Sequence, residues 1–155
     1  MSRKWHVHDI PNIYIHSHNL IMAHVNSNPN PSNRITDDCT VRALAIALGS
    51  TWQGIYIKLT LQGLVMGRMP SSNGVWMKFL ENEGYKRQII PDTCPYCYSV
   101  KDFCNDHPEG RYILGTGTHV IAVIQGDYYD TFDSGDMTPL CFWDVTEVKQ
   151  NPSEE

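Results

Sequence analysis

Three residues that lie far apart in the chain have side chains that could act together in nucleophilic catalysis: Cys39, His119 and Asp133. A thiol nucleophile needs a base, and the base needs a group that orients it. Cys39 follows Asp37 and Asp38 at the start of a predicted helix, where the helix dipole and unpaired amides favour the thiolate over the thiol. A lone cysteine is more often a small buried apolar residue, so Cys39 is a candidate only because a base is available.

The candidate base and the candidate acid lie in two segments that are predicted as neighbouring antiparallel strands. His119 opens a run rich in β-branched residues, 119–125, and Asp133 follows a second such run, 128–132. Adjacent antiparallel strands can place a histidine and a carboxylate side by side. The expected order is therefore a cysteine on a helix, a histidine on a strand and an acid on the next strand.

The loop between these two strands decides which acid faces the histidine. A three-residue loop, Gln125–Asp127, places Asp133 opposite His119, and this is the loop we predict. A two-residue turn at Gly126-Asp127 would turn Asp133 to the other face. For any of the aspartates here, the competing interpretation is a solvated turn carboxylate. Two other aspartates are fallback acids, Asp130 and Asp136.

This order resembles the papain-like cysteine peptidase superfamily, and within it the bacterial double-glycine peptidases that process leader peptides and small uncharacterised bacterial and phage relatives. The resemblance covers roughly residues 33–143. The matching segments are Asp38-Cys39 with the helix to Leu48, Gly117–Val123 and Tyr129–Asp133.

The resemblance implies a role for each residue. Cys39 would attack a carbonyl, His119 would act as base and then as acid, and Asp133 would hold the imidazole. Those peptidases carry a glutamine six residues before the cysteine, which donates to the oxyanion. Here the position holds Asn33, which keeps the amide but is one methylene shorter. Asn33 and the Cys39 backbone amide are thus the expected oxyanion donors.

A second cluster could bind a metal ion. The string Cys94-Pro95-Tyr96-Cys97, followed by Cys104 and His107, holds four potential zinc ligands. The two pairs stand closer together than in common zinc fingers. We therefore favour a core position for Cys104 and a helix-end position for His107, and expect neither a metal nor a cofactor. Two His-x-His pairs near the N-terminus are more simply half-exposed strand residues, His6/His8 and His16/His18.

The segments that must position these residues predict an α+β fold of the papain-like kind: N-terminal helices, with the cysteine on the central one, packed on a C-terminal antiparallel sheet. We expect one domain over 1–155, with an N-terminal arm or extra strands in 1–32, a catalytic core in 33–148 and a polar tail in 149–155. The predicted helices are 39–48, 52–66, 73–83 and 100–105, and the predicted strands are 88–90, 111–115, 119–125, 128–132 and 141–148.

Composition narrows the function further. The 155 residues are 41% apolar, which is enough for a core, and the net charge of -5 supplies no basic face for nucleic acid. No apolar run is long enough to span a membrane, and five cysteines, an odd number, favour a reducing, cytoplasmic compartment.

We therefore predict a cysteine hydrolase, most simply a peptidase or isopeptidase, that acts on a peptide or protein without nucleic acid or membrane partners. Nothing in the sequence indicates an oligomeric state. Acyl transfer of the transglutaminase, deamidase or acetyltransferase kind remains an alternative, because those enzymes also use cysteine, histidine and aspartate in this order. The non-enzymatic alternative is a zinc-stabilised or degenerate module that binds peptides.

Overall fold

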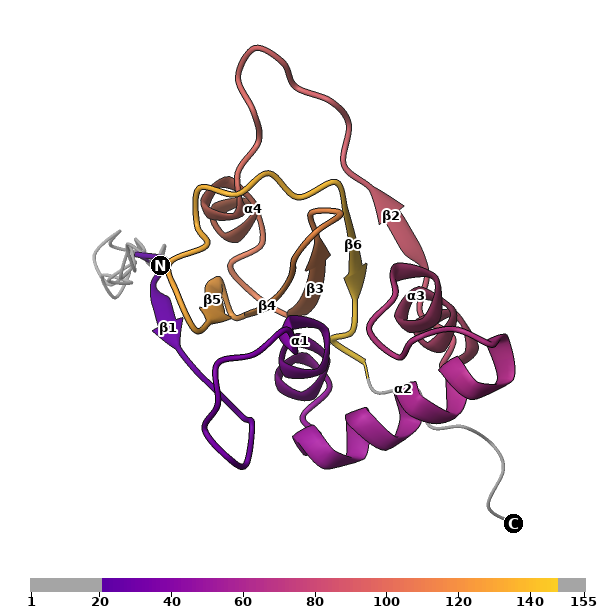
Figure 1. The fold of residues 1–155 in the computed structure, drawn as a ribbon. Helices are drawn as coiled ribbons and strands as arrows, with labels where there is room; N and C mark the ends of the chain where they lie inside the picture. The colour runs from indigo at the N-terminus through magenta and orange to yellow at the C-terminus, as the bar shows by residue number, and fades with distance from the viewer. Residues whose placement is uncertain (1–20, 148–155) are drawn as a thin grey trace, which may run out of the picture.

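The structure, a computed structural model, describes residues 21–147 (Figure 1). Within this range the chain forms four helices and a six-stranded mixed sheet, so the predicted α+β class is confirmed. The two His-x-His pairs, most of the predicted N-terminal arm and the polar tail lie outside the described residues.

The four helices lie where the sequence predicts them, within about two residues at each end. The helix α2, Trp52–Met66, ends at a glycine. The residue after Met66, Gly67, has the left-handed conformation, with φ 61°. The start of α2 is capped by the Thr51 side chain, which accepts the amide of Gly54. The bounds are α1 Cys39–Ala47, α2 Trp52–Met66, α3 Asn73–Asn82 and α4 Val100–Asp106.

The sheet has the strand order β1-β5-β4-β3-β6-β2. All neighbouring pairs are antiparallel except β1 and β5, which are parallel. The predicted antiparallel sheet is therefore incomplete, since a strand from the N-terminal 1–32 segment joins its edge and makes it mixed. The bounds are β1 His24–Asn26, β2 Arg87–Ile89, β3 Arg111–Gly115, β4 Val120–Ile124, β5 Asp127–Asp130 and β6 Cys141–Asp144.

The hairpin between β4 and β5 differs from the prediction. Ile124 pairs with Asp127, so the loop is the two residues Gln125 and Gly126, both with positive φ (52° and 80°). Two positive φ angles are the signature of the tight turn that matches the strand twist. The predicted three-residue loop is wrong, and the register of every residue after it changes accordingly.

Helices cover both faces of the sheet, and α1 contacts β3, β4 and β5 directly (Figure 1). Alternate residues of the strands point into two separate apolar clusters, as the period of a strand requires. The first cluster joins α1, α2 and α3 to the sheet and includes Leu44, Leu59, Trp76, Ile113, Ala122 and Trp143. The second lies between α4 and the sheet and includes Val100, Phe103, Leu114, Ile121 and Val123. The buried α1 thereby holds its first residue, Cys39, against the sheet.

Candidate active site

Cys39 is the first residue of α1, and the helix start beside it is uncapped. Asp38 occupies the N-cap position, but its carboxylate makes no hydrogen bond to the helix amides. Among the described residues, none accepts a hydrogen bond from the amides of 39–41. Free amides and the positive end of the helix dipole therefore surround the half-buried thiol, which favours a thiolate there.

His119 precedes β4 and forms a close pair with Asp130, the last residue of β5. Nε2 of His119 lies 2.6 Å from Oδ2 of Asp130, and the side chains are only 11% and 3% exposed. The two-residue turn explains this pairing, because the continued register places His119 opposite Phe132, two residues beyond Asp130 on the same side of the strand. The Phe132 ring also contacts the imidazole, with the centroids 5.1 Å apart.

Asp133, the acid predicted from the sequence, does not pair with His119. Its Oδ1 accepts the Tyr128 hydroxyl at 2.6 Å and the Gly135 amide at 3.1 Å, and its side chain is exposed. The reason is the hairpin register, which moves the acid position from Asp133 to the fallback residue Asp130. The other fallback acid, Asp136, binds Lys101 in an ion pair.

Cys39 and His119 interact across the site. Burial raises the pKa of the Cys39 thiol, but its contacts with the His119 side chain and with the Val120 amide outweigh burial and hold this pKa below its ordinary value. Since Nε2 of His119 faces Asp130, Nδ1 is the nitrogen left for the sulfur. The thiol, the imidazole and the carboxylate therefore form one continuous chain of contacts.

The imidazole is biased toward its charged form. Burial lowers the pKa of His119, but the hydrogen bond to Asp130 and the contact with Cys39 more than offset it and raise this pKa to about 9. Burial raises the pKa of Asp130, yet its hydrogen bond with His119 brings this pKa below its ordinary value. Both shifts therefore favour the thiolate–imidazolium pair of Cys39 and His119 over the neutral pair.

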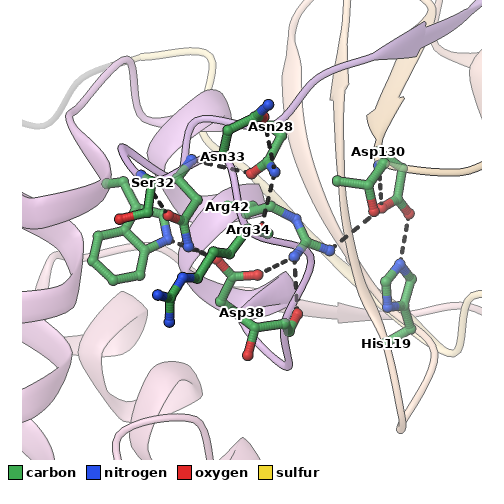
Figure 2. A network of polar contacts seen from close by, with 12 residues as sticks. Asn28, Ser32, Asn33, Arg34, Asp38, Arg42, His119 and Asp130 are labelled. Atoms are coloured by element: carbon green, nitrogen blue, oxygen red, sulfur yellow. Dashed lines mark hydrogen bonds and ion pairs between the residues drawn. The ribbon is translucent and has the colours of Figure 1, made fainter.

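A buried polar network lies behind this chain of contacts, and no pattern in the sequence indicates it. Figure 2 shows Arg42 between Asp38 and Asp130, with His119 on the far side of Asp130. The guanidinium donates to Asp38 and forms an ion pair of 3.7 Å with Asp130. All three side chains are buried, although helical periodicity alone would have left Arg42 on a polar face.

Asn33 is held within its own loop rather than at His119. Its backbone adopts a left-handed conformation, φ 50°, and its backbone N–H donates to the backbone carbonyl of Asn30 at 2.8 Å. The side-chain oxygen lies 3.5 Å from Nδ2 of Asn28. In Figure 2, Asn33 lies beside Asn28, with Arg42 between it and the His119–Asp130 pair. The structure therefore brings Cys39, His119 and Asp130 together and leaves Asn33 outside that group.

The four potential zinc ligands do not converge. Cys94 and Cys97 are exposed, whereas Cys104 is buried in the α4 cluster. His107 follows α4 and stacks on Phe103, with the ring centroids 3.9 Å apart. Over residues 21–147, no three histidine, cysteine or acidic side chains form a group that could hold a metal ion.

Comparisons of the chain with protein-family models, with curated proteins and with solved structures found no significant match. A function for this chain therefore has to be inferred from its residues and their geometry. None of the helices in the described part of the chain is both long and apolar enough to cross a membrane.

Proposed function

We propose that the protein is a cysteine hydrolase of the papain-like kind, a peptidase or isopeptidase that acts on a peptide or protein. The observation that carries the proposal is the chain of contacts from Cys39 through His119 to Asp130. It joins a thiol of lowered pKa to an imidazole of raised pKa and a buried carboxylate. Catalytic nucleophiles and bases are characteristically tuned in this way.

In the first half of the reaction the Cys39 thiolate attacks the carbonyl carbon of the scissile amide. The electron pair of the C=O bond moves to oxygen, and the Cys39 amide at the uncapped start of α1 donates to this oxyanion. The His119 imidazolium then gives its proton to the leaving nitrogen as the C–N bond breaks. The products of this half are a free amine, a thioester on Cys39 and a neutral His119.

In the second half, the neutral imidazole removes a proton from water, and the resulting hydroxide attacks the thioester. Collapse of the second tetrahedral intermediate releases a carboxylic acid and restores the Cys39 thiolate beside the His119 imidazolium. Throughout, Asp130 accepts the proton-bearing Nε2 of His119, so the ring keeps Nδ1 toward the sulfur. A reducing compartment, as expected from the cysteine count, would keep Cys39 active.

The test is a digest of a peptide library, with the products identified by mass spectrometry for the unmodified protein and for Cys39→Ala. We expect new peptide termini with the unmodified protein only. Addition of a primary amine distinguishes the acyl acceptors, because an amide product would replace the free acid if acyl transfer dominates. Equal product profiles for the two proteins, together with no labelling of Cys39 by iodoacetamide, would contradict the proposal in favour of a peptide-binding module.

A further inference from the structure

A buried arginine connects the helix that carries the thiol to the strand that carries the acid. Arg42 lies on α1, three residues after Cys39, and is 5% exposed. Its Nη2 lies 3.7 Å from Oδ1 of Asp130, while Oδ2 of the same carboxylate contacts His119. Oδ1 of Asp130 therefore faces Arg42 and also accepts the Thr131 backbone amide at 2.8 Å, whereas Oδ2 faces His119.

Arg42 is itself fixed on its other side. Its Nη1 donates to Oδ1 of Asp38, and Oδ2 of Asp38 accepts from the Trp52 indole and the Asn30 amide, both at 2.9 Å. A guanidinium is a planar fork, so a fixed Nη1 determines where Nη2 points. Movement of Arg42 away from Asp130 would also remove one of the two cationic groups beside this buried carboxylate, which is costly.

We infer that Arg42 is a positioning residue, which fixes the Asp130 carboxylate so that Oδ2 stays on the His119 imidazole. The inference rests on the proposed function, in that it assigns Asp130 and His119 to catalysis. It adds a residue that touches neither the substrate nor the reacting atoms.

The alternative is that Arg42 acts on His119 only through its charge. The two explanations predict opposite changes in the pKa of His119 when Arg42 is replaced. Cys39 from α1 and Asp130 from β5 face His119, and Arg42 and Asp38 lie behind Asp130. From β1, His24 contacts the backbone carbonyl of Asp130 through Nε2 at 3.2 Å. Loss of the Arg42 charge alone makes it easier to protonate His119 and raises its pKa. Loss of positioning removes the carboxylate from the imidazolium and lowers this pKa.

The experiment compares three variants, Arg42→Gln, Arg42→Lys and Arg111→Gln, by NMR titration of the His119 Hε1 resonance, assigned through its loss in His119→Ala. We expect the His119 titration to move to lower pH by about one pH unit in Arg42→Gln, a tenfold change in proton affinity. Arg42→Lys keeps a cation between the two buried carboxylates, which preserves folding, but loses the fork. It should move the titration in the same direction by a smaller amount.

Arg111→Gln is the matched control. Arg111 donates to the carbonyls of Ile46 and Ala47, both at 2.7 Å, so it supports the opposite end of the same helix. Its replacement should destabilise α1 without moving the His119 titration.

Two results would overturn the inference: a His119 titration in Arg42→Lys that matches the unmodified protein, or one in Arg42→Gln that moves to higher pH. The readout needs no substrate. An unreactive Cys39 in the unmodified protein would therefore refute the proposed function, and the titration would still decide the role of Arg42.

Discussion

Two regions of the molecule combine cysteine with histidine, and their surroundings shift the thiol pKa in opposite directions. Around Cys39 the fold gathers a helix start, an imidazole and a buried carboxylate, and the pKa of the thiol falls below its ordinary value. Around Cys104 it gathers apolar side chains, and burial raises the pKa of that thiol to about 12. The same chemical group thus has a lowered pKa at Cys39, which favours the thiolate, and a raised pKa at Cys104, which favours the neutral thiol.

The difference indicates that the density of cysteine and histidine in the sequence does not predict where a thiol pKa is lowered. The 94–107 segment has four ligand-type residues within fourteen positions, yet its members lie in unlike environments. Cys39, His119 and Asp130 are spread over more than ninety positions and converge because α1 packs against the strands that carry the other two. What decides the chemistry is which elements the core brings together.

The largest effect expected concerns the base. His119→Ala should reduce turnover of any substrate found by more than about 1,000-fold, because no other described group near Cys39 can take and return the proton. Steady-state rates, with circular dichroism to confirm folding, measure this. A turnover rate of His119→Ala within about tenfold of the unmodified protein would contradict the role of His119 as the base for Cys39.

The next effect is the ranking of the thiols. At pH 6, iodoacetamide should label Cys39 at least about tenfold faster than Cys94, Cys97, Cys104 or Cys141, since reactivity follows the thiolate fraction. The rate should rise as pH passes the lowered pKa of Cys39. Activity, which also needs the imidazolium, should fall again as pH passes the His119 pKa of about 9. Peptide mapping of the labelled protein checks the ranking, and preferential labelling of Cys94 or Cys97 would reverse it.

The choice of acid gives an intermediate effect. Asp130→Ala should lower kcat by about 100-fold, and Asp130→Asn by less, because an asparagine oxygen can still accept the imidazole N–H, as in papain-like sites with Cys-His-Asn. Asp133→Ala serves as the matched control and should stay close to the unmodified rate, since Asp133 binds Tyr128. The opposite pattern, loss in Asp133→Ala and retention in Asp130→Ala, would restore the acid predicted from the sequence.

A small effect is expected at Asn33. Removal of an oxyanion donor typically costs about 100- to 1,000-fold in rate, but the structure holds Asn33 in a loop with Asn28 and Asn30. We therefore expect Asn33→Ala to lower kcat by no more than about threefold. Measurement of kcat and KM for this variant is sufficient. A loss of 100-fold or more would show that Asn33 reaches the oxyanion when substrate binds.

The sequence alone predicts part of the fold and part of the candidate site. Apolar periodicity and glycine stops predicted the helices 39–48, 52–66 and 73–83, and a fourth helix was predicted at 100–105. The pairing of a helix-start cysteine with a strand-start histidine was available from residue types. The acid was missed because the hairpin register depends on Gln125, whose positive φ is unusual for a residue with a side chain, so the loop was predicted one residue too long.

Two further features had no local signal at all. In the β1–β5 pair, His24 lies opposite Tyr128. Parallel pairing between two short segments so far apart in the sequence produces no periodic pattern within either segment. The burial of Arg42 likewise depends on Asp130, which is distant in sequence and arrives only when the sheet packs on α1.

The last prediction concerns metal in the second region. We expect no stoichiometric zinc in the purified protein, because zinc binding requires thiolates and the buried Cys104, with its pKa of about 12, would have to give up its proton in an apolar cluster. His107 stacks on Phe103, and its Nδ1 lies 3.0 Å from the Phe103 carbonyl, so only its Nε2 could bind a metal. Elemental analysis of the unmodified protein and of Cys94→Ser measures this directly. One zinc per chain that disappears in Cys94→Ser would mean that the exposed loop and α4 rearrange to converge on a metal, and the 94–107 region would then be a structural site rather than a set of separate thiols.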